Sequence, residues 1–445
     1  MIIKTKPKLI DYFFWIIFII YTNPGGILEY FGENGKESGI DISDFLFFML
    51  FGCYLVVFKK GRFVKDKMYG KVIKSLIIFS LYYLIVFCFF VPILKNVPNY
   101  SVFNTIIKIR HGIFNILLVV MIYEFYMRSQ MIFFKSFLFS SIIVMILFII
   151  SFFSGFEILP VEEMNRVFVE TKRLLMMNYG LMPILIPMGI VILIFKFDIR
   201  FDKIIVIGFF LMFIVWLLSL LRRNIFGTVI YFVVASFLFN YITHKDLIPF
   251  KKIISTTFYL IILFFILQLS FPKYVEGGYA AFEETIHIIQ YGETISGGKD
   301  SRMGFGTKFI QNIIFNNPFF GTGFDNKWRT LDGDRAGYEA TDYPFLSSLA
   351  MSGVMGVLFF LPIYIILIKM LIMDIRYLRV NRFDSLSFET YMLVLFIVYF
   401  IFDLMQYMNW FLPISIIGDI KWYVYLALYM ASRNIFYRKK RVLVN

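Results

Sequence analysis

Basic side chains in the connections between apolar segments are the groups of this chain best suited to chemistry. Arg222 and Arg223 follow one another in a tight turn between two such segments. A guanidinium stays charged and offers a planar fork of donors that matches phosphate oxygens. A cluster of them predicts a site for a phosphate-bearing ligand, although a salt bridge explains any single arginine equally well. The other basic candidates are Arg166, Lys172, Arg173, Arg302, Lys308 and Arg335.

Metal chemistry has little support in the sequence. The two cysteines, Cys53 and Cys88, both lie inside apolar segments, and no two of the three histidines share a metal-ligand spacing. We therefore expect neither a metal site nor another cofactor.

The composition indicates which elements must position the basic candidates. Of the 445 residues, 60% are hydrophobic and 17% are charged, whereas a soluble domain is about half apolar and about a quarter charged. The excess lies in long uncharged blocks, each near the roughly 20 residues that a helix needs to cross a bilayer. The sequence predicts an all-α polytopic integral membrane protein with about 12 transmembrane helices. The predicted segments are residues 9–28, 41–58, 72–92, 104–127, 136–154, 175–195, 204–221, 225–243, 253–271, 343–370, 386–403 and 411–432.

The distribution of lysine and arginine predicts the orientation in the membrane. With the N-terminus and its Lys4, Lys6 and Lys8 in the cytoplasm, most lysines and arginines lie either in that N-terminal segment or in the cytoplasmic connections 59–71, 128–135, 196–203, 244–252, 373–384 and the tail 433–445. This pattern follows the positive-inside rule, and it accounts for most of the formal net charge of +14 without a nucleic-acid partner. We expect a multi-pass protein of the bacterial inner (plasma) membrane with both termini in the cytoplasm.

Three regions follow from this topology. Residues 1–270 are predicted to form an N-terminal transmembrane bundle of about nine helices, and residues 271–342 one large periplasmic cap loop with short helices. Residues 343–445 then supply the C-terminal transmembrane helices and a basic cytoplasmic tail. The basic candidates named above all fall on the predicted outer face, although the positive-inside rule places lysine and arginine mainly on the cytoplasmic side.

Ionisable side chains also occur inside the predicted segments. Such residues are costly in a bilayer, and they are functional or paired with one another. For Lys108 and Arg110, near the outer end of the fourth segment, we expect ion pairs with Asp403, Asp419 or both.

Several short motifs between residues 166 and 356 resemble those of a known family. In chain order they are Arg166 or Arg173 ahead of Asn178-Tyr-Gly180, Ser219-Leu-Leu-Arg222-Arg223, Arg302-Met-Gly-Phe-Gly, Asn316-Asn-Pro318-Phe-Phe-Gly321-Thr-Gly323, and Asp342-Tyr343-Pro-Phe-Leu346 before Gly353-Val-Met-Gly356. In their order along the chain and their shared predicted side of the membrane, these motifs resemble those of the O-antigen polymerase and ligase superfamily, which includes Wzy and WaaL. That family's late outer loop runs from an arginine through an Asn-Pro-x-x-Gly-x-Gly turn to a His/Asp-x-x-x-Leu segment that opens a Gly-x-x-Gly helix. Its ligases place histidine where this chain has Asp342, so the chain looks more like the polymerases.

The resemblance implies a GT-C-like glycosyltransferase that uses a donor linked to undecaprenyl diphosphate. Arginines can stabilise the leaving diphosphate without a metal, and the acceptor hydroxyl needs a carboxylate or imidazole within hydrogen-bond reach. Asp342 is expected to orient the acceptor more than to abstract its proton, because positive neighbours weaken a carboxylate as a base. The residues implied as catalytic are Asp342, Arg302, Arg222 and Arg223. Those implied in substrate binding are Arg166, Lys172, Arg173, Lys308, Arg335 and Tyr343.

The predicted function is polymerisation of O-antigen repeat units in lipopolysaccharide biosynthesis. The implied partners are undecaprenyl-diphosphate-linked oligosaccharide repeat units, the lipid bilayer and a chain-length regulator protein. A ligase that transfers the glycan to lipid A core is the first alternative, and a lipid-linked oligosaccharide flippase is the second. A flippase needs charged residues deep in a central cavity, whereas the unusual charges here concentrate on the predicted outer side.

Overall fold

The computed structural model describes the chain in separate stretches. They are residues 8–31, 42–58, 67–86, 102–165, 172–176, 178–219, 222–243, 318–321, 344–380, 387–405 and 420–444, together with Phe265, Gln268, Glu283 and His287. At some positions, including Lys172, Arg173, Arg222 and Arg223, only the backbone is described. Of the predicted cap at 271–342, only Glu283, His287 and residues 318–321 belong to the described part.

The described stretches are mainly helical, as the sequence predicts. Every predicted apolar segment overlaps a described helix except 253–271, which lies almost wholly outside the described residues. The described residues also form two 3-10 helices. η1 (Pro24–Phe31) follows α1, and η3 (Met182–Ile184) precedes α6. The α-helices are α1 (Leu9–Tyr21), α2 (Ile42–Val57), α3 (Lys67–Ile85), α5 (Val102–Ser154), α6 (Leu185–Phe195), α7 (Asp202–Leu218), α8 (Arg222–Thr243), α13 (Pro344–Val380), α14 (Phe388–Met405) and α15 (Ile420–Val444).

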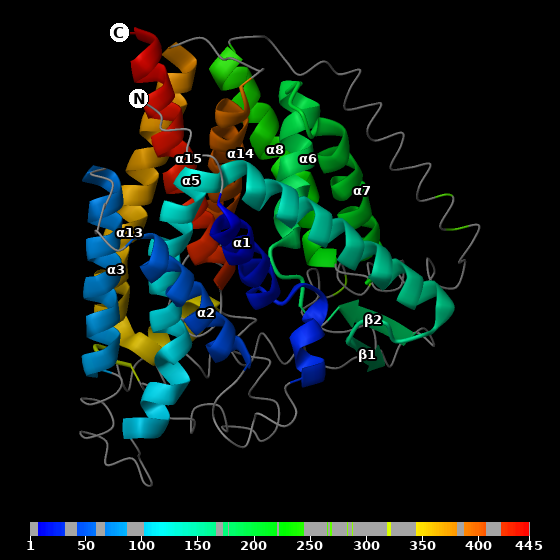
Figure 1. Ribbon diagram of the computed structural model, residues 1–445, viewed down its shortest axis with the longest axis horizontal. Helices are drawn as coiled ribbons and strands as arrows, with labels where there is room; N and C mark the ends of the chain where they lie inside the picture. The colour runs from blue at the N-terminus through cyan, green and yellow to red at the C-terminus, as the bar shows by residue number, and fades with distance from the viewer. Residues whose placement is uncertain are drawn as a thin grey trace.

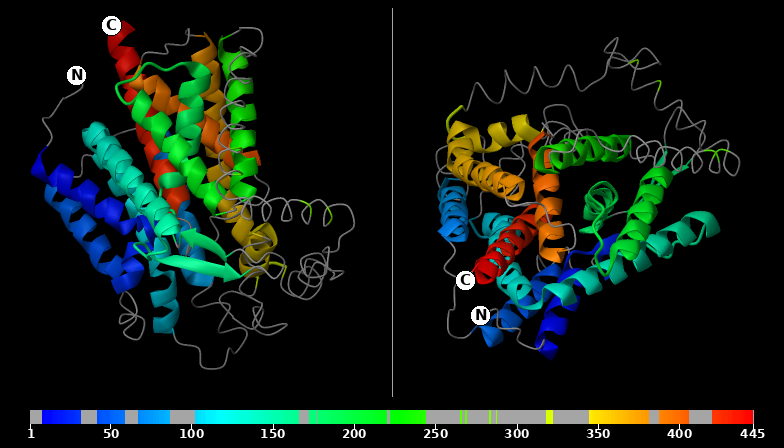
Figure 2. Two further views of the ribbon diagram at one scale, coloured as in Figure 1. Left: turned by 90° about the vertical axis from the view of Figure 1, so that its right-hand side faces the viewer. Right: turned by 90° about the horizontal axis from the view of Figure 1, so that it is seen from above.

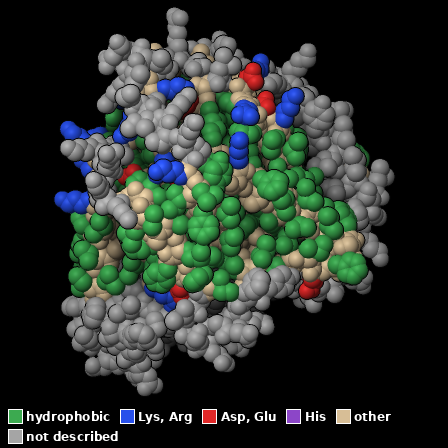
Figure 3. Space-filling model, viewed as in Figure 1, with side chains coloured by type: hydrophobic (Ala, Val, Ile, Leu, Met, Phe, Trp, Pro, Cys, Tyr) green, Lys and Arg blue, Asp and Glu red, His purple; other side chains and the backbone are tan. Residues whose placement is uncertain are grey.

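Within the described residues, two helical stretches are long and apolar enough to cross a membrane. They are Ile113–Ser154 in α5 and Gly353–Val380 in α13. A broad band of hydrophobic side chains covers the middle of the face seen in Figure 3, whereas soluble monomers rarely expose apolar patches larger than a few hundred Å². These features are consistent with a helical membrane protein. Four further apolar helices are shorter: Leu9–Tyr21, Ile42–Val57, Met182–Phe195 and Gly227–Thr243.

The helices form a bundle in which α6 occupies the interior (Figures 1 and 2). α6 packs against α7, α8 and α14. Its sequence is apolar on every side, as expected for a helix enclosed by others, and all of its residues except Leu193 are buried. Gly189 permits the contact with α7, because a Cβ atom there would lie 2.4 Å from Cβ of Phe209. On the other side of the bundle α15 packs on α5 and α14, and α13 packs on α3.

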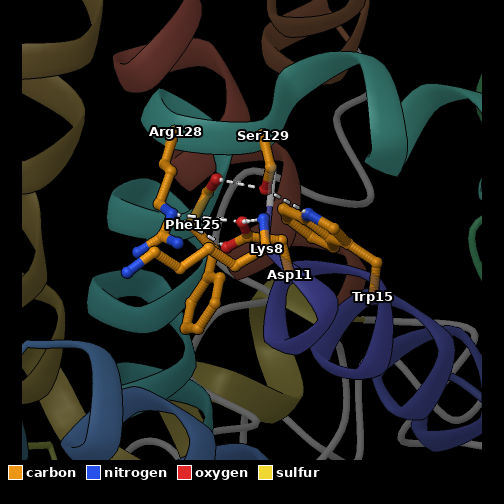
Figure 4. Close-up of polar contacts among 6 residues, drawn as sticks. All are labelled: Lys8, Asp11, Trp15, Phe125, Arg128 and Ser129. Atoms are coloured by element: carbon orange, nitrogen blue, oxygen red, sulfur yellow. Dashed lines mark hydrogen bonds and ion pairs between the residues drawn. The ribbon is translucent and has the colours of Figure 1, made fainter. Parts of the chain in front are cut away.

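α5 continues through the predicted connection 128–135 as a bent helix. The bend falls at Ser129, whose backbone leaves the helical region with φ −137° and ψ 39°. The Ser129 hydroxyl donates to the Phe125 carbonyl at 2.8 Å and accepts from Trp15 Nε1 of α1 at 2.8 Å (Figure 4). A side chain that bonds into the helix ladder is a recognised cause of a kink. The chain therefore turns here by bending a helix, not by forming a loop.

The next connection contains an antiparallel ribbon that the all-α prediction missed. β1 (Val161–Asn165) pairs with β2 (Lys172–Met176), with Met164 opposite Arg173 and Asn165 opposite Lys172. The strands are short and lack a regular alternation of apolar and polar residues, which is the usual signal of a strand.

The bundle has two unlike ends (Figure 1). α15 ends at one of them, here called the terminal end, and the ribbon lies at the other, the ribbon end. Lysine and arginine side chains gather near the terminal end of the face shown in Figure 3.

A buried ion pair joins α13 and α15 near the terminal end. Asp374 is 0% exposed, and Arg433 Nε donates to its two carboxylate oxygens at 2.8 and 3.0 Å. The hydroxyls of Tyr429 and Tyr437 each donate to the same carboxylate at 2.7 Å. A buried charge is tolerated when it is both paired and hydrogen-bonded in this way.

A second buried acid, Asp11, joins α1 to α5. The Lys8 backbone N–H donates to Asp11 Oδ2 at 2.8 Å, which caps the start of α1. Arg128, next to the bend in α5, pairs with Asp11 at 2.9 Å between Nε and Oδ1, as Figure 4 shows. Both buried acids thus fix helices that are far apart in the sequence.

Candidate functional site

The predicted site residues divide into two groups by what is described of them. Of those whose backbone is described, Lys172 and Arg173 open β2, and Arg222 and Arg223 open α8. The remaining candidates lie outside the described residues, and they are Arg166, Arg302, Lys308, Arg335, Asp342 and Tyr343.

A hydrogen bond joins two of the family-like motifs. Tyr179, in the Asn178-Tyr-Gly180 motif, donates from its hydroxyl to Oγ of Ser219 at 3.3 Å. Ser219 is fully buried at the end of α7 and opens the turn that leads to Arg222. The stretch that follows β2 therefore lies against the end of α7.

The stretch after β2 is also held by the backbone at the end of α1. The Gly25 N–H donates to the Asn178 carbonyl at 2.7 Å. Gly180 has φ +49°, and a Cβ atom there would lie 3.1 Å from the Thr22 carbonyl oxygen, so a side chain is disfavoured on both counts. The Asn178 side chain accepts from the Gly180 N–H at 2.8 Å. These contacts fix the point where the ribbon joins the bundle.

α15 fixes the start of the next element. The Tyr425 hydroxyl donates to the Leu181 carbonyl at 3.0 Å, in the turn before η3 and α6. Tyr425 in turn makes an edge-to-face contact with Tyr399 of α14, with the ring centroids 4.6 Å apart. The ribbon end is therefore tied to the last two helices of the chain as well as to α1.

Asp403 is a buried acid in the same half of the bundle, near the end of α14. It is 4% exposed, and it lies close enough to Tyr231 of α8 and Tyr364 of α13 to interact electrostatically with both. Tyr231 stacks on the neighbouring Phe402 at a centroid distance of 3.7 Å. In a helix that crosses a bilayer, such an acid would be a candidate functional group, whereas the sequence predicts Asp403 only as an ion-pair partner.

Arg110 has a partner that sequence analysis did not name. Its guanidinium forms a two-point contact with Asp44 at the start of α2, Nε to Oδ1 at 2.8 Å and Nη2 to Oδ2 at 2.9 Å. The sequence instead predicts a pair with Asp403 or Asp419, and Asp419 lies outside the described residues. Hydropathy alone cannot show that α2 begins beside α5, because that contact depends on tertiary packing.

A second pair of motifs meets at the break in α13, just after Gly353. The Val354 N–H donates to the Pro318 carbonyl at 2.8 Å, and the Met355 N–H donates to the Phe319 carbonyl at 3.1 Å. Pro318 and Phe319 belong to the Asn-Pro-x-x-Gly-x-Gly motif, and Val354 and Met355 to the Gly-x-x-Gly motif. The order of the motifs along the chain is thus accompanied by contacts between them.

No family model, curated protein or solved structure matches this chain.

The described geometry can favour an anion at the start of α8. The first N–H groups of a helix and its dipole attract negative charge, and this helix opens with two consecutive arginines. Tyr179 and Ser219 were both within the motifs quoted from the sequence, but their contact was not predicted. Tyr425 was missed because a tyrosine in an apolar segment gives no signal of its partner.

Proposed function

We propose that this chain is an O-antigen polymerase of the bacterial inner membrane, related to the Wzy group. It would transfer a glycan from undecaprenyl diphosphate to a second lipid-linked repeat unit at the periplasmic face. The observation that carries the proposal is the pairing of the family-like motifs, Tyr179 with Ser219 and the Pro318 turn with Val354. Motifs that act together are expected to be adjacent in space although they lie far apart in the sequence.

The proposed membrane topology has separate support. The composition, the apolar band of Figure 3 and the two long apolar helices favour a membrane location. α15 ends at the basic end of the bundle, and α1 runs away from that end toward the ribbon end. This agrees with both termini in the cytoplasm under the positive-inside rule. The ribbon end then faces the periplasm.

The proposed reaction is a displacement at the anomeric carbon of the donor sugar. The acceptor hydroxyl forms a bond to that carbon, the bond to the diphosphate oxygen breaks, and undecaprenyl diphosphate leaves with the electron pair. The hydroxyl proton passes to a carboxylate or to water. Arg222 and Arg223 would stabilise the diphosphate, with Arg302 as a third cation, and Asp342 would orient the acceptor.

The acid at position 342 favours a polymerase over a ligase. The ligases of the resembled family carry histidine at this position, and Asp342 is the feature shared with the polymerases. The remaining candidates, Arg166, Lys172, Arg173, Lys308, Arg335 and Tyr343, would bind the substrates around the two reacting groups.

The lipopolysaccharide banding pattern of a deletion strain tests the proposed function. A polymerase predicts loss of the ladder with a single repeat unit retained on the core, and recovery of the ladder with a plasmid copy of the gene. Loss of every repeat unit from the core would instead indicate a ligase or a flippase. An unchanged ladder would contradict all three.

A further inference from the structure

α13 is broken at Gly353 into two helical stretches. Gly353 has φ 63° and ψ −176°, a backbone conformation that is essentially confined to glycine. The first stretch, residues 344–352, lies across the ribbon end at an angle to the longer stretch that follows (Figure 1, yellow). The direction of the first stretch is therefore set at one residue.

The turn at Pro318–Gly321 caps the second stretch. The first N–H groups of a helix have no partner within the helix, and here two of them, from Val354 and Met355, donate to the carbonyls of Pro318 and Phe319. The turn needs its own glycine, because Gly321 has φ +69°. We call this set of contacts, between residues 318–321 and 353–355, the Gly353 clasp.

Gly353 is also required for space. A Cβ atom there would lie 2.2 Å from the Phe319 carbonyl oxygen and 2.6 Å from the Phe320 nitrogen. Both neighbours are backbone atoms, so no rotation of a side chain can relieve the contact. Any other residue at 353 must push the turn away from α13.

We infer that the Gly353 clasp is a positioning device for the acceptor side of the active site. A stretch as short as 344–352 is marginal as an isolated helix, so its orientation depends on the clasp. Asp342 and Tyr343 directly precede this stretch in the chain, so the clasp sets the direction of the helical stretch that follows them. The inference rests on the proposed function for the reaction and on the described backbone for the clasp.

Amide hydrogen exchange tests the clasp itself. In Gly353→Ala, the amides of Val354 and Met355 should exchange faster than in the parent protein, while the rest of α13 keeps its protection. Gly52→Ala is the matched control, because a Cβ atom at Gly52 in α2 meets nothing within 4 Å. Unchanged exchange at Val354 and Met355 in Gly353→Ala would overturn the clasp.

A second variant keeps the test decisive if Gly353→Ala does not fold. Val354→Pro removes one of the two donors, and proline is well tolerated in the first turn of a helix. Val354 is 43% exposed, so the loss of its side chain itself should matter little. This variant should speed exchange at Met355 while the remainder of the bundle stays protected.

Turnover of the purified protein tests the positioning role. With undecaprenyl-diphosphate-linked repeat units at saturation, Gly353→Ala should lose about 100-fold in turnover, the scale expected for a misplacement of about 1 Å. The half-saturating substrate concentration should stay close to that of Gly52→Ala. The thermal midpoint should fall below that of Gly52→Ala, because alanine is strained at this backbone conformation, so turnover is compared at equal amounts of folded protein. An opened clasp with normal turnover would overturn the positioning role. A parent protein that makes no polymer would instead contradict the proposed function, and the positioning role with it, whatever the exchange result.

Discussion

At the terminal end of the bundle, charged side chains hold the helices together, whereas at the ribbon end many of the contacts are made by the backbone at glycines. Asp374 and Asp11 are buried acids that each bind an arginine of another helix. At the ribbon end, Gly25 bonds to the Asn178 carbonyl, and the Gly353 clasp joins α13 to a distant turn. The pair between Arg110 and Asp44 is a charged contact at that end.

The difference indicates how the two ends are specialised. A buried ion pair commits both side chains to the fold, and the loss of either partner leaves an uncompensated charge. A backbone contact fixes the course of the chain whatever side chains the neighbouring positions carry. We therefore expect substitution of the buried, paired Arg433 to affect stability at the terminal end, and substitution of Arg222 and Arg223 to affect catalysis at the ribbon end.

The largest expected effect is on stability, at the terminal end. Arg433→Ala leaves Asp374 buried without its guanidinium and should destabilise the protein by about 3–5 kcal/mol. The measurement is the thermal midpoint and yield of the protein in detergent. Arg438→Ala, an exposed arginine in the following turn of α15, should behave like the parent. Equal stability of the two variants would contradict the structural role of the buried pair.

At the ribbon end, the double substitution Arg222→Ala/Arg223→Ala should abolish polymer formation with little change in thermal stability. The single substitution Arg222→Lys keeps the charge but loses the planar fork, and it should raise the activation free energy by about 1–3 kcal/mol. Both are measured as ladder formation at matched membrane abundance. A normal ladder from the double variant would exclude these arginines from the diphosphate site.

A smaller effect is expected at the bend in α5. Ser129→Ala removes the acceptor for Trp15 Nε1 in a buried setting and should cost about 1–3 kcal/mol of stability. Ser140 is a matched control, because its hydroxyl likewise donates to a carbonyl of its own helix, at 3.1 Å to Phe137. Ser140→Ala should lower the thermal midpoint less. If Ser129→Ala and Ser140→Ala lower the thermal midpoint equally, the contact with α1 does not stabilise the bend.

The smallest effect is expected for the exposed pair at the terminal end. Lys439 Nζ lies 2.9 Å from Glu389 Oε2, but the lysine side chain is 46% exposed. Exposed pairs contribute about 0–1 kcal/mol, so Lys439→Ala should leave the thermal midpoint nearly unchanged. If Lys439→Ala lowered the thermal midpoint as much as Arg433→Ala does, the exposed ion pair would stabilise the protein as strongly as the buried one, contrary to this account.

Hydropathy located the described helices because the length of an apolar run is a local property of the sequence. The bend at Ser129 could not be predicted, since it depends on Trp15, which lies 114 residues away. The ribbon was missed because its short strands lack a regular alternation. For the site, the motifs could be quoted from the sequence, but the contact between Tyr179 and Ser219 and the Gly353 clasp require the packed structure. The sequence likewise does not show which side chains lie next to Asp403 and Asp44.

The central claim is that this chain polymerises lipid-linked repeat units with Asp342 at the acceptor. The most direct measurement supplies the purified protein, in liposomes, with undecaprenyl-diphosphate-linked repeat units and resolves the products by length. We predict a ladder of products from the parent protein and none from Asp342→Asn at equal amounts of folded protein. A ladder from Asp342→Asn equal to that of the parent would reduce Asp342 to a helix cap, since asparagine caps a helix about as well as aspartate. The absence of any ladder from the parent protein would contradict the polymerase assignment itself.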